Sequence, residues 1–407
     1  MPFEKVNLNT PHLTLWLSSE QGLVFHQGQK SLSQLEPITI AILIALDEGL
    51  TDEQAIVELQ QYSKLTTQQI TPALAQVKAL FDNSQEPRTY ADGRYPELKP
   101  HHSQSVKKQD FCIQVANSTF VIQCANKTLE QDIQALLQPI QIKTEQLANQ
   151  QRIDFIFEVK IEQGQYQLYS NNLLVEQDLK QNQVVPILID RLQILSYQQS
   201  NYCFGFHGAA LKNEHNTILL PGVSGAGKST LTAELSKQNF QVYSDEIIAL
   251  DNNFTLTSLA LPMAIKSGSW QHIAELYPEI EKQKQWHRID GRILKYIWPE
   301  HIAQNEVFGD DLGLACAIEN GACHTNTTTQ TLLLSPKYDK RATPKATKLT
   351  VSDTLKLVTE GGYQLGVELN EHTIEKLLDY CQHISTYQIT YATSEQADNL
   401  VTALCQA

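Results

Sequence analysis

The residues best suited to chemistry lie near the middle of the chain, where an apolar run from Thr217 ends in a glycine-rich turn. The turn reads Gly-Val-Ser-Gly-Ala-Gly-Lys-Ser over residues 222–229, and an apolar helical pattern through Leu231 and Leu235 follows it. Glycines permit backbone conformations that bring N–H groups against phosphate oxygens at the positive end of a helix. The lysine would reach the outer phosphates, and the serine hydroxyl would hold Mg²⁺. This spacing predicts a phosphate-binding loop for a nucleoside triphosphate.

The expected ligands are therefore ATP and Mg²⁺, with guanine left open because no base-reading motif is visible. The predicted nucleotide-binding residues of the loop and of the first helical turn are Gly222, Ser224, Gly225, Ala226, Gly227, Lys228, Ser229 and Thr230. We count Lys228 among the catalytic residues as well, because its ammonium would lie on the phosphates that react.

An acidic pair follows the loop helix. Residues 240–251 show an apolar strand pattern that carries Asp245 and Glu246. Next to the loop, the Asp245 carboxylate could hold Mg²⁺ through water or accept a proton from an attacking hydroxyl. Adjacent carboxylates on an extended strand point to opposite faces, so the two should differ in role unless the strand bends. The chain has neither a transporter-ATPase signature nor an Asn-Lys-x-Asp guanine reader, which favours kinases over motors and GTPase switches.

Cations gather after this pair, although the chain carries a formal net charge of -14. Phosphoryl transfer needs positive groups on the oxygens that gain charge. We expect Lys266 to serve in catalysis, with Arg288 and Arg292 next as phosphate-binding residues. The acidic balance of the whole chain disfavours binding to nucleic acid or to an anionic membrane.

Composition and length place the chain among soluble, multi-domain proteins. At 407 residues it should form two or three domains. Its seven cysteines are scattered without a Cys-x-x-Cys pair, which indicates neither a disulfide framework nor a zinc site. The chain does not open with a secretory pattern, and its longest uncharged apolar run, residues 38–46, is too short to cross a membrane. We expect a cytoplasmic protein.

Residues 1–85 are predicted to form a small α+β domain of the winged-helix type, because two short strand patterns precede three helical patterns. The third helix offers only Lys78 as a cation, which disfavours DNA binding. Residues 86–108 are polar and contain prolines, as linkers do. The strands are expected over residues 13–17 and 22–26, and the helices over residues 36–47, 52–62 and 67–81.

Two further segments are expected to support the nucleotide domain. Residues 110–197 alternate strand and helical patterns and show no group of charged residues suited to catalysis. We therefore predict a β-rich subdomain that packs against the rest of the nucleotide domain. Near the end of the chain, helical patterns at residues 352–360 and 371–380 and a strand at residues 386–391 should complete the α/β core.

The central block resembles the HPr kinase/phosphorylase superfamily. The similarity rests on Phe-His-Gly-Ala-Ala at residues 206–210, on the loop, and on Tyr-Ser-Asp-Glu at residues 243–246. It implies an α/β P-loop kinase domain over residues 109–407 that phosphorylates a serine or threonine hydroxyl with Mg-ATP. The resemblance also implies site roles: Asp245 as the base, Glu246 or Ser229 as the metal ligand, and His207 as the residue that orients or tunes Asp245. Because a glutamate replaces the second aspartate of the HPr enzymes, the metal-binding carboxylate stays open.

The N-terminal domain resembles the PqqD-like modules that recognise precursor peptides in the biosynthesis of ribosomally made, modified peptides. The matching features are the strand pair and the patterns at residues 35–49 and 51–59. In that family the leader peptide adds as an extra β-strand at an exposed edge. Together the two resemblances imply a kinase for a docked precursor peptide or small protein, with homo-oligomerisation left open. Two rivals remain: a small-molecule kinase for a free hydroxy amino acid, and a non-enzymatic, nucleotide-gated binding protein.

Overall fold

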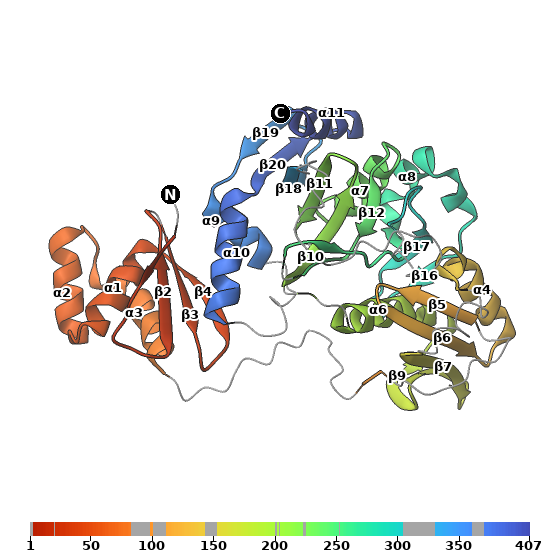
Figure 1. Ribbon diagram of the computed structural model, residues 1–407, viewed down its shortest axis with the longest axis horizontal. Helices are drawn as coiled ribbons and strands as arrows, with labels where there is room; N and C mark the ends of the chain where they lie inside the picture. Colours follow the sequence, from red (N-terminus) through yellow and green to blue (C-terminus); the bar gives the residue numbers. More distant parts are fainter. Residues whose placement is uncertain are drawn as a thin grey trace, which may run out of the picture. The chain divides into compact units, whose positions relative to one another are not determined.

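The computed structural model describes residues 3–19, 21–82, 98–100, 111–142, 153–199, 202, 204–222, 225–251, 253–303, 330–359 and 370–407. The chain has a mixed α/β architecture with several sheets, as predicted at that level (Figure 1). It divides into two compact units, one of residues 1–91, 350–356 and 365–384, and one of residues 92–349, 357–364 and 385–407. The predicted linker, residues 86–108, lies outside the described residues except for residues 98–100. A transmembrane span would need a longer and more apolar helix than any that the described residues form.

The first unit contains a four-stranded antiparallel sheet whose strands pair in chain order. Its strands are β1 (Glu4–Val6), β2 (Leu13–Leu17), β3 (Gly22–His26) and β4 (Ser31–Leu35), and its next helices are α1 (Pro37–Asp47), α2 (Asp52–Tyr62) and α3 (Thr67–Phe81). The three helices match the prediction, and Leu15, Ile42 and Ile70 share one core between them and the sheet. The outer strands β1 and β4 were not predicted, because β1 has only three residues and both strands are largely polar.

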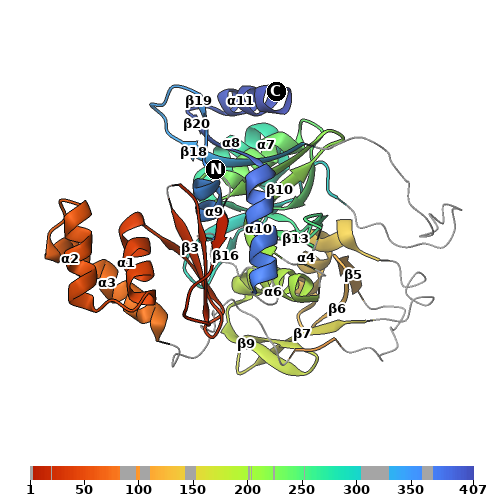
Figure 2. The same ribbon diagram turned by 60° about the vertical axis from the view of Figure 1, so that its left-hand side comes forward.

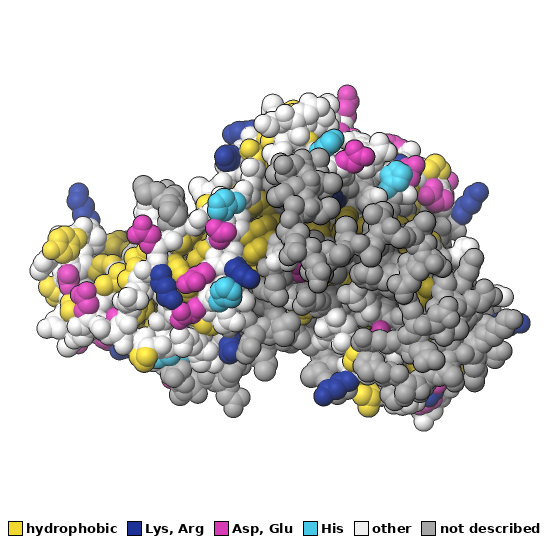
Figure 3. Space-filling model, viewed as in Figure 1, with side chains coloured by type: hydrophobic (Ala, Val, Ile, Leu, Met, Phe, Trp, Pro, Cys, Tyr) yellow, Lys and Arg dark blue, Asp and Glu magenta, His cyan; other side chains and the backbone are white. Residues whose placement is uncertain are grey.

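Helix α10 (Glu371–His383) also belongs to the first unit. Three side chains of the N-terminal strands and turns donate hydrogen bonds to the Glu371 carboxylate: Lys5, Thr14 and Gln27, at 2.5, 2.6 and 2.9 Å. Figure 2 shows α10 alongside the sheet. The last helices were expected to complete the α/β core. Helix α10 and the start of α9 (Val351–Thr359) belong to the first unit instead, which corrects that expectation. Local periodicity does not show this, because the contacts are made with residues far away in the sequence. On the face shown in Figure 3, acidic and basic side chains of this unit are interspersed.

The second unit is organised around an eight-stranded sheet in the order β14-β13-β10-β11-β18-β20-β19, with β12 paired to β10. Strand β11 (Asn216–Pro221) lies inside this sheet, antiparallel to β10 (Phe204–Lys212) and parallel to β18 (Gln330–Tyr338). The other strands are β12 (Gln241–Ser244), β13 (Ile247–Leu250), β14 (Leu256–Thr257), β19 (Lys345–Lys348) and β20 (Ser385–Tyr391). Helices α7 (Lys228–Ser236) and α11 (Ser394–Cys405) share the core of this sheet.

A second sheet of five strands forms the β-rich subdomain predicted for residues 110–197. It consists of β5 (Phe111–Val115), β6 (Ser118–Cys124), β7 (Phe155–Glu162), β8 (Gln165–Ser170) and β9 (Leu173–Leu179), with helices α4 (Lys127–Leu137) and α6 (Gln181–Gln199). One hydrophobic core joins α6 both to this sheet and to a small sheet. That small sheet is built from β15 (Met263–Lys266), β16 (Trp286–His287) and β17 (Ile293–Ile297), and α8 (Trp270–Leu276) follows β15. Helix α6 packs against β16, so it lies next to the turn that carries two of the predicted cations, Arg288 and Arg292.

Candidate active site

Strand β11 leads directly into the predicted phosphate-binding loop. Gly222, Gly225 and Gly227 have φ angles of 141°, 95° and 93°, which only glycine adopts without strain. Gly227 is the N-cap of α7 and offers no side-chain hydrogen bond, so the first N–H groups of the helix can serve an anion. A Cβ atom on Gly227 would lie 3.1 Å from the Tyr391 hydroxyl. Ser224 lies outside the described residues, so its predicted contact with nucleotide stays a prediction.

A cavity of about 380 Å³ opens over the start of α7. The loop and the helix contribute Gly225, Gly227, Lys228, Ser229 and Thr230 to its lining. The facing strands and turns contribute His207, Asp245, Glu246, Lys266, Arg288 and Arg292. The structure thus gathers the predicted catalytic, metal-binding and cationic side chains around one space, whereas Gly222 and Ala226 shape the loop without lining the cavity.

The chain bends where the two acidic residues lie. Strand β12 ends at Ser244, β13 begins at Ile247, and a shift in the register with β10 leaves Tyr243 as a bulge. The Ser244 hydroxyl accepts hydrogen bonds from the backbone N–H groups of Glu246 and Ile247, at 3.3 and 3.1 Å. Bulges often re-aim side chains next to functional sites. Because of this bend, both carboxylates line the same cavity instead of pointing to opposite faces.

Asp245 has the environment of a proton acceptor. Burial, together with the charge of Glu246, raises the pKa of Asp245 to about 7, although the Ser229 hydroxyl and the Lys228 ammonium act in the opposite direction. Its Oδ1 atom is buried and has no hydrogen-bond partner in the part of the chain that the structure describes. A carboxyl group with this pKa can take up a proton near neutral pH, which suits a general base.

His207 lies between the loop lysine and the acidic pair. The Lys228 ammonium donates to the Gly222 carbonyl at 2.7 Å and to Nε2 of His207 at 3.2 Å. The other ring nitrogen, Nδ1, lies 3.0 Å from the Glu246 carbonyl oxygen. A neutral ring with its proton on Nδ1 satisfies both contacts, and burial lowers the pKa of His207 accordingly. The role predicted for His207 was to orient Asp245, whereas these contacts join it to Lys228 and Glu246.

Three cations face the acidic pair from the small sheet. Lys266 ends β15, and the turn between β16 and β17 carries Arg288 and Arg292. Burial lowers the pKa of Lys266, and the two nearby arginines lower it further. Arg292 is fixed by Asp290, which accepts from its Nε at 2.8 Å and from its Nη2. This grouping matches what charge build-up on a transferring phosphoryl group requires.

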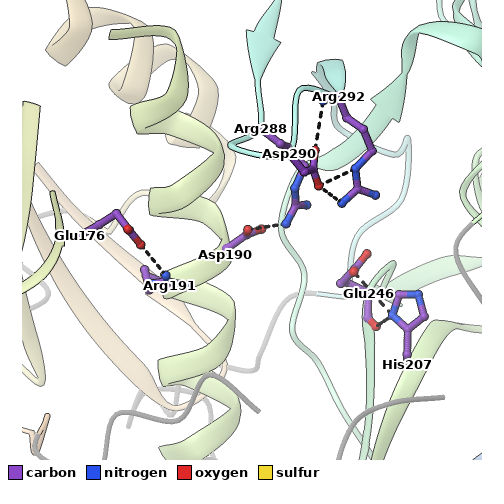
Figure 4. Close-up of polar contacts among 8 residues, drawn as sticks. All are labelled: Glu176, Asp190, Arg191, His207, Glu246, Arg288, Asp290 and Arg292. Atoms are coloured by element: carbon purple, nitrogen blue, oxygen red, sulfur yellow. Dashed lines mark hydrogen bonds and ion pairs between the residues drawn. The ribbon is translucent and has the colours of Figure 1, made fainter. Parts of the chain in front are cut away.

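Arg288 is held by a residue that the sequence did not single out. Its Nη2 donates to Oδ2 of Asp190 on α6 at 2.6 Å, and Figure 4 shows the two side chains reaching toward each other. Burial raises the pKa of Asp190 to about 6, while the Arg288 charge lowers it. The expectation that residues 110–197 only contribute packing is therefore corrected. The available signal was the charged pair Asp190-Arg191 within an otherwise apolar helical stretch.

No protein-family model matches the chain, and no curated protein matches it either. What the cavity can do must therefore follow from its own groups: a loop that binds anions, a carboxyl group that titrates near neutral pH, and cations that face it.

These groups fit a magnesium ion. The Ser229 hydroxyl and the carboxylates of Asp245 and Glu246 are hard oxygen ligands of the kind that Mg²⁺ prefers. The unpartnered Oδ1 of Asp245 is a ready acceptor for a hydrated ion. Among the described residues, no group of three or more histidine, cysteine, aspartate or glutamate side chains is arranged to hold a metal ion by itself. Mg²⁺ in nucleotide sites needs none, because phosphates and water supply its other ligands.

Proposed function

We propose that the chain is a Mg-ATP-dependent kinase that phosphorylates a serine or threonine hydroxyl of a peptide or small protein. The observation that carries the proposal is Asp245, a buried carboxyl group with a pKa of about 7 in the same cavity as the phosphate-binding loop. A loop alone would suit a switch or a motor equally well. A base that accepts protons near neutral pH supports transfer to a hydroxyl.

In the proposed reaction, the acceptor O–H gives its proton to the Asp245 carboxylate. The acceptor oxygen forms a bond to the γ-phosphorus, the bond from that phosphorus to the β,γ-bridging oxygen breaks, and ADP leaves with the electron pair. Lys228 and the N–H groups at the start of α7 hold the phosphates, and Lys266, Arg288 and Arg292 offset the charge on the transferring oxygens. Mg²⁺, when bound, supplies further positive charge to the phosphates.

Features of the first unit support a peptide as the substrate. Among the described strands, β1 and β4 each pair on one side only, and such edges can accept an extended peptide as an additional strand. The resemblance of this unit to PqqD-like modules points to a ribosomally synthesised precursor peptide. The mixed charges seen in Figure 3 suit a peptide better than nucleic acid, which a basic surface would favour.

The direct test is intact-mass spectrometry of short peptides encoded beside the gene, incubated with the protein and Mg-ATP. We expect the mass of one phosphate group to be added to one peptide. Lys228→Ala should abolish this gain, and Asp245→Asn should abolish it while nucleotide binding persists. ATP consumption with free serine, without modification of any peptide, would replace the proposal with a small-molecule kinase. Tight ATP binding without transfer to any acceptor would identify a nucleotide-gated binding protein.

A further inference from the structure

A second, smaller cavity adjoins the acidic pair. It measures about 40 Å³ and shares Asp245, Glu246, Ala264 and Arg288 with the larger cavity. The larger cavity includes the phosphate-binding loop, whereas the smaller one is lined by α6 and by the segment that leads into β15. The two carboxylates therefore line two spaces, one suited to the triphosphate and one much smaller.

Beyond the acidic pair and its ion-paired neighbours, the smaller cavity offers two polar side chains, Gln193 of α6 and Tyr296 of β17. Gln193 is the one that carries an amide. The residue lines this cavity and is only 8 % exposed. Its side-chain amide has no hydrogen bond to any residue that the structure describes. Its polar atoms are not among the fully buried side-chain atoms that lack a partner, so the amide is open to the cavity and can donate to or accept from a ligand there. The remaining lining is largely apolar and includes Leu259, Leu261 and Met263.

We propose that the smaller cavity is the acceptor subsite, and that Gln193 hydrogen-bonds the hydroxyl-bearing side chain that enters it. This inference rests on the proposed kinase function and identifies the acceptor class, a small aliphatic alcohol. In-line transfer requires the acceptor oxygen to approach phosphorus opposite the leaving group, hence from the side away from ADP. A hydroxyl group there can give its proton to Asp245 while its second lone pair accepts from the Gln193 amide.

The size of the cavity sets the selectivity. On this measure a cavity needs roughly 10–15 Å³ to hold one water molecule, so a space of about 40 Å³ accepts a group of two or three heavy atoms, such as a hydroxymethyl or hydroxyethyl group. A phenol ring is several times larger and would have to displace the packed apolar lining, which is costly in a well-packed interior. Serine and threonine side chains therefore fit, and tyrosine does not.

The test compares two acceptors, N-acetylserinamide and N-acetyltyrosinamide, supplied in excess with Mg-ATP to the full-length protein. We expect phosphorylation of the serine compound only. Gln193→Leu should raise the acceptor KM about tenfold, the effect of losing one buried hydrogen bond, and leave the KM for ATP unchanged. Gln198→Leu is the matched control, because this half-buried glutamine lies on the same helix outside both cavities.

A second readout separates this inference from the kinase proposal. Saturation-transfer NMR detects binding of N-acetylserinamide to the protein with a non-hydrolysable ATP analogue, where no phosphoryl group moves. If the serine compound binds, Gln193→Leu weakens this binding about tenfold, and no transfer from ATP occurs, the subsite is supported and the kinase is overturned. Transfer with an unchanged acceptor KM in Gln193→Leu would overturn the subsite and leave the kinase standing. Equal phosphorylation of the tyrosine compound, or no binding of the serine compound, would also overturn the subsite.

Discussion

The ammonium group of Lys228 lies 3.2 Å from Nε2 of His207, so the loop lysine is held by a histidine that must be neutral. Protonation of the ring would place two positive charges against each other. Burial lowers the pKa of His207, which keeps the ring neutral at and above its ordinary titration range. Of His207 and Asp245, the group that changes charge near pH 7 is therefore Asp245.

We predict that kcat/KM for phosphoryl transfer falls as the pH drops through about 7. The pKa of Asp245 is raised to about 7, so the carboxylate that accepts the proton exists above this pH and is lost below it. His207→Gln should raise the KM for ATP, because Lys228 loses its partner, and leave this acid limb where it is. Steady-state rates from pH 5.5 to pH 9 would measure both effects. An acid limb that vanishes in His207→Gln would assign the titration to the histidine instead.

Asp190→Asn is predicted to lower kcat about 10- to 100-fold, since Arg288 loses the carboxylate that orients it. The same change should not lower the melting temperature at pH 7.5. The folded-state pKa of Asp190 is raised to about 6, so the charged carboxylate disfavours folding above that pH. Glu176→Gln is the matched control, because Glu176 pairs with Arg191, the next residue on α6, at 2.8 Å. Equal activity losses in the two variants would show that the helix needs its ion pairs only for structure.

Gly227→Ala is predicted to weaken ATP binding more than Gly225→Ala. Both glycines have φ near 95°, where an alanine costs about 1–2 kcal/mol. Only at Gly227 would the new Cβ also meet the Tyr391 hydroxyl, whereas the space around Gly225 is open. We expect Kd to rise about tenfold for Gly225→Ala, in line with that strain, and further for Gly227→Ala.

Adding Tyr391→Phe to Gly227→Ala should recover the extra loss and leave the backbone strain. Isothermal titration calorimetry with the three variants would resolve these contributions. If Tyr391→Phe restores nothing, the steric account of Gly227 is incorrect.

Glu371→Ala is predicted to destabilise the first unit by about 1–2 kcal/mol, near the lower end because the carboxylate is about one-third exposed. The hydrogen bonds from Lys5 and Thr14 lower the pKa of Glu371 below its ordinary value. A lowered carboxyl pKa stabilises the fold above pH 4.5 and stops doing so as the pH falls through the folded-state pKa.

Hydrogen exchange of the β2 and β3 amides would measure this loss at neutral pH, and urea unfolding at several pH values should show the difference narrowing under acid conditions. Glu375→Ala is the control, because its contact with Lys5 is longer, at 3.5 Å, and more exposed. A Glu375→Ala variant as unstable as Glu371→Ala would contradict the assigned role of the Glu371 carboxylate.

The parts of the site that could be predicted are those set by local spacing. The loop places three glycines and Lys228 within one short stretch, and β12 brings Asp245 close behind it in sequence. Helices α1, α2 and α3 were predictable for the same reason. Thr51 and Thr66 cap α2 and α3, whereas α1 is marked by an apolar run that begins with Pro37 and is followed by Gly49.

Asp190, Gln193 and Glu371 could not be predicted, because their roles depend on which distant element each one meets. The apolar pattern of α6 locates the helix. Because the helix is buried on several sides, the pattern does not tell which neighbouring element each polar side chain meets. The carboxylate of Glu371 stands at the start of a helix, where an acidic residue is common. Nothing nearby in the sequence indicates that its partners lie at the other end of the chain.

The hydrogen bonds that join the N-terminal sheet to α10 have a consequence for how the protein folds during synthesis. A ribosome releases the N-terminal strands long before Glu371, their hydrogen-bonding partner, has been synthesised. At roughly 5–20 residues per second, the wait is on the order of tens of seconds. During that time Lys5, Thr14 and Gln27 lack their native partner, so the first unit reaches its final hydrogen bonding only when synthesis of the chain is nearly complete.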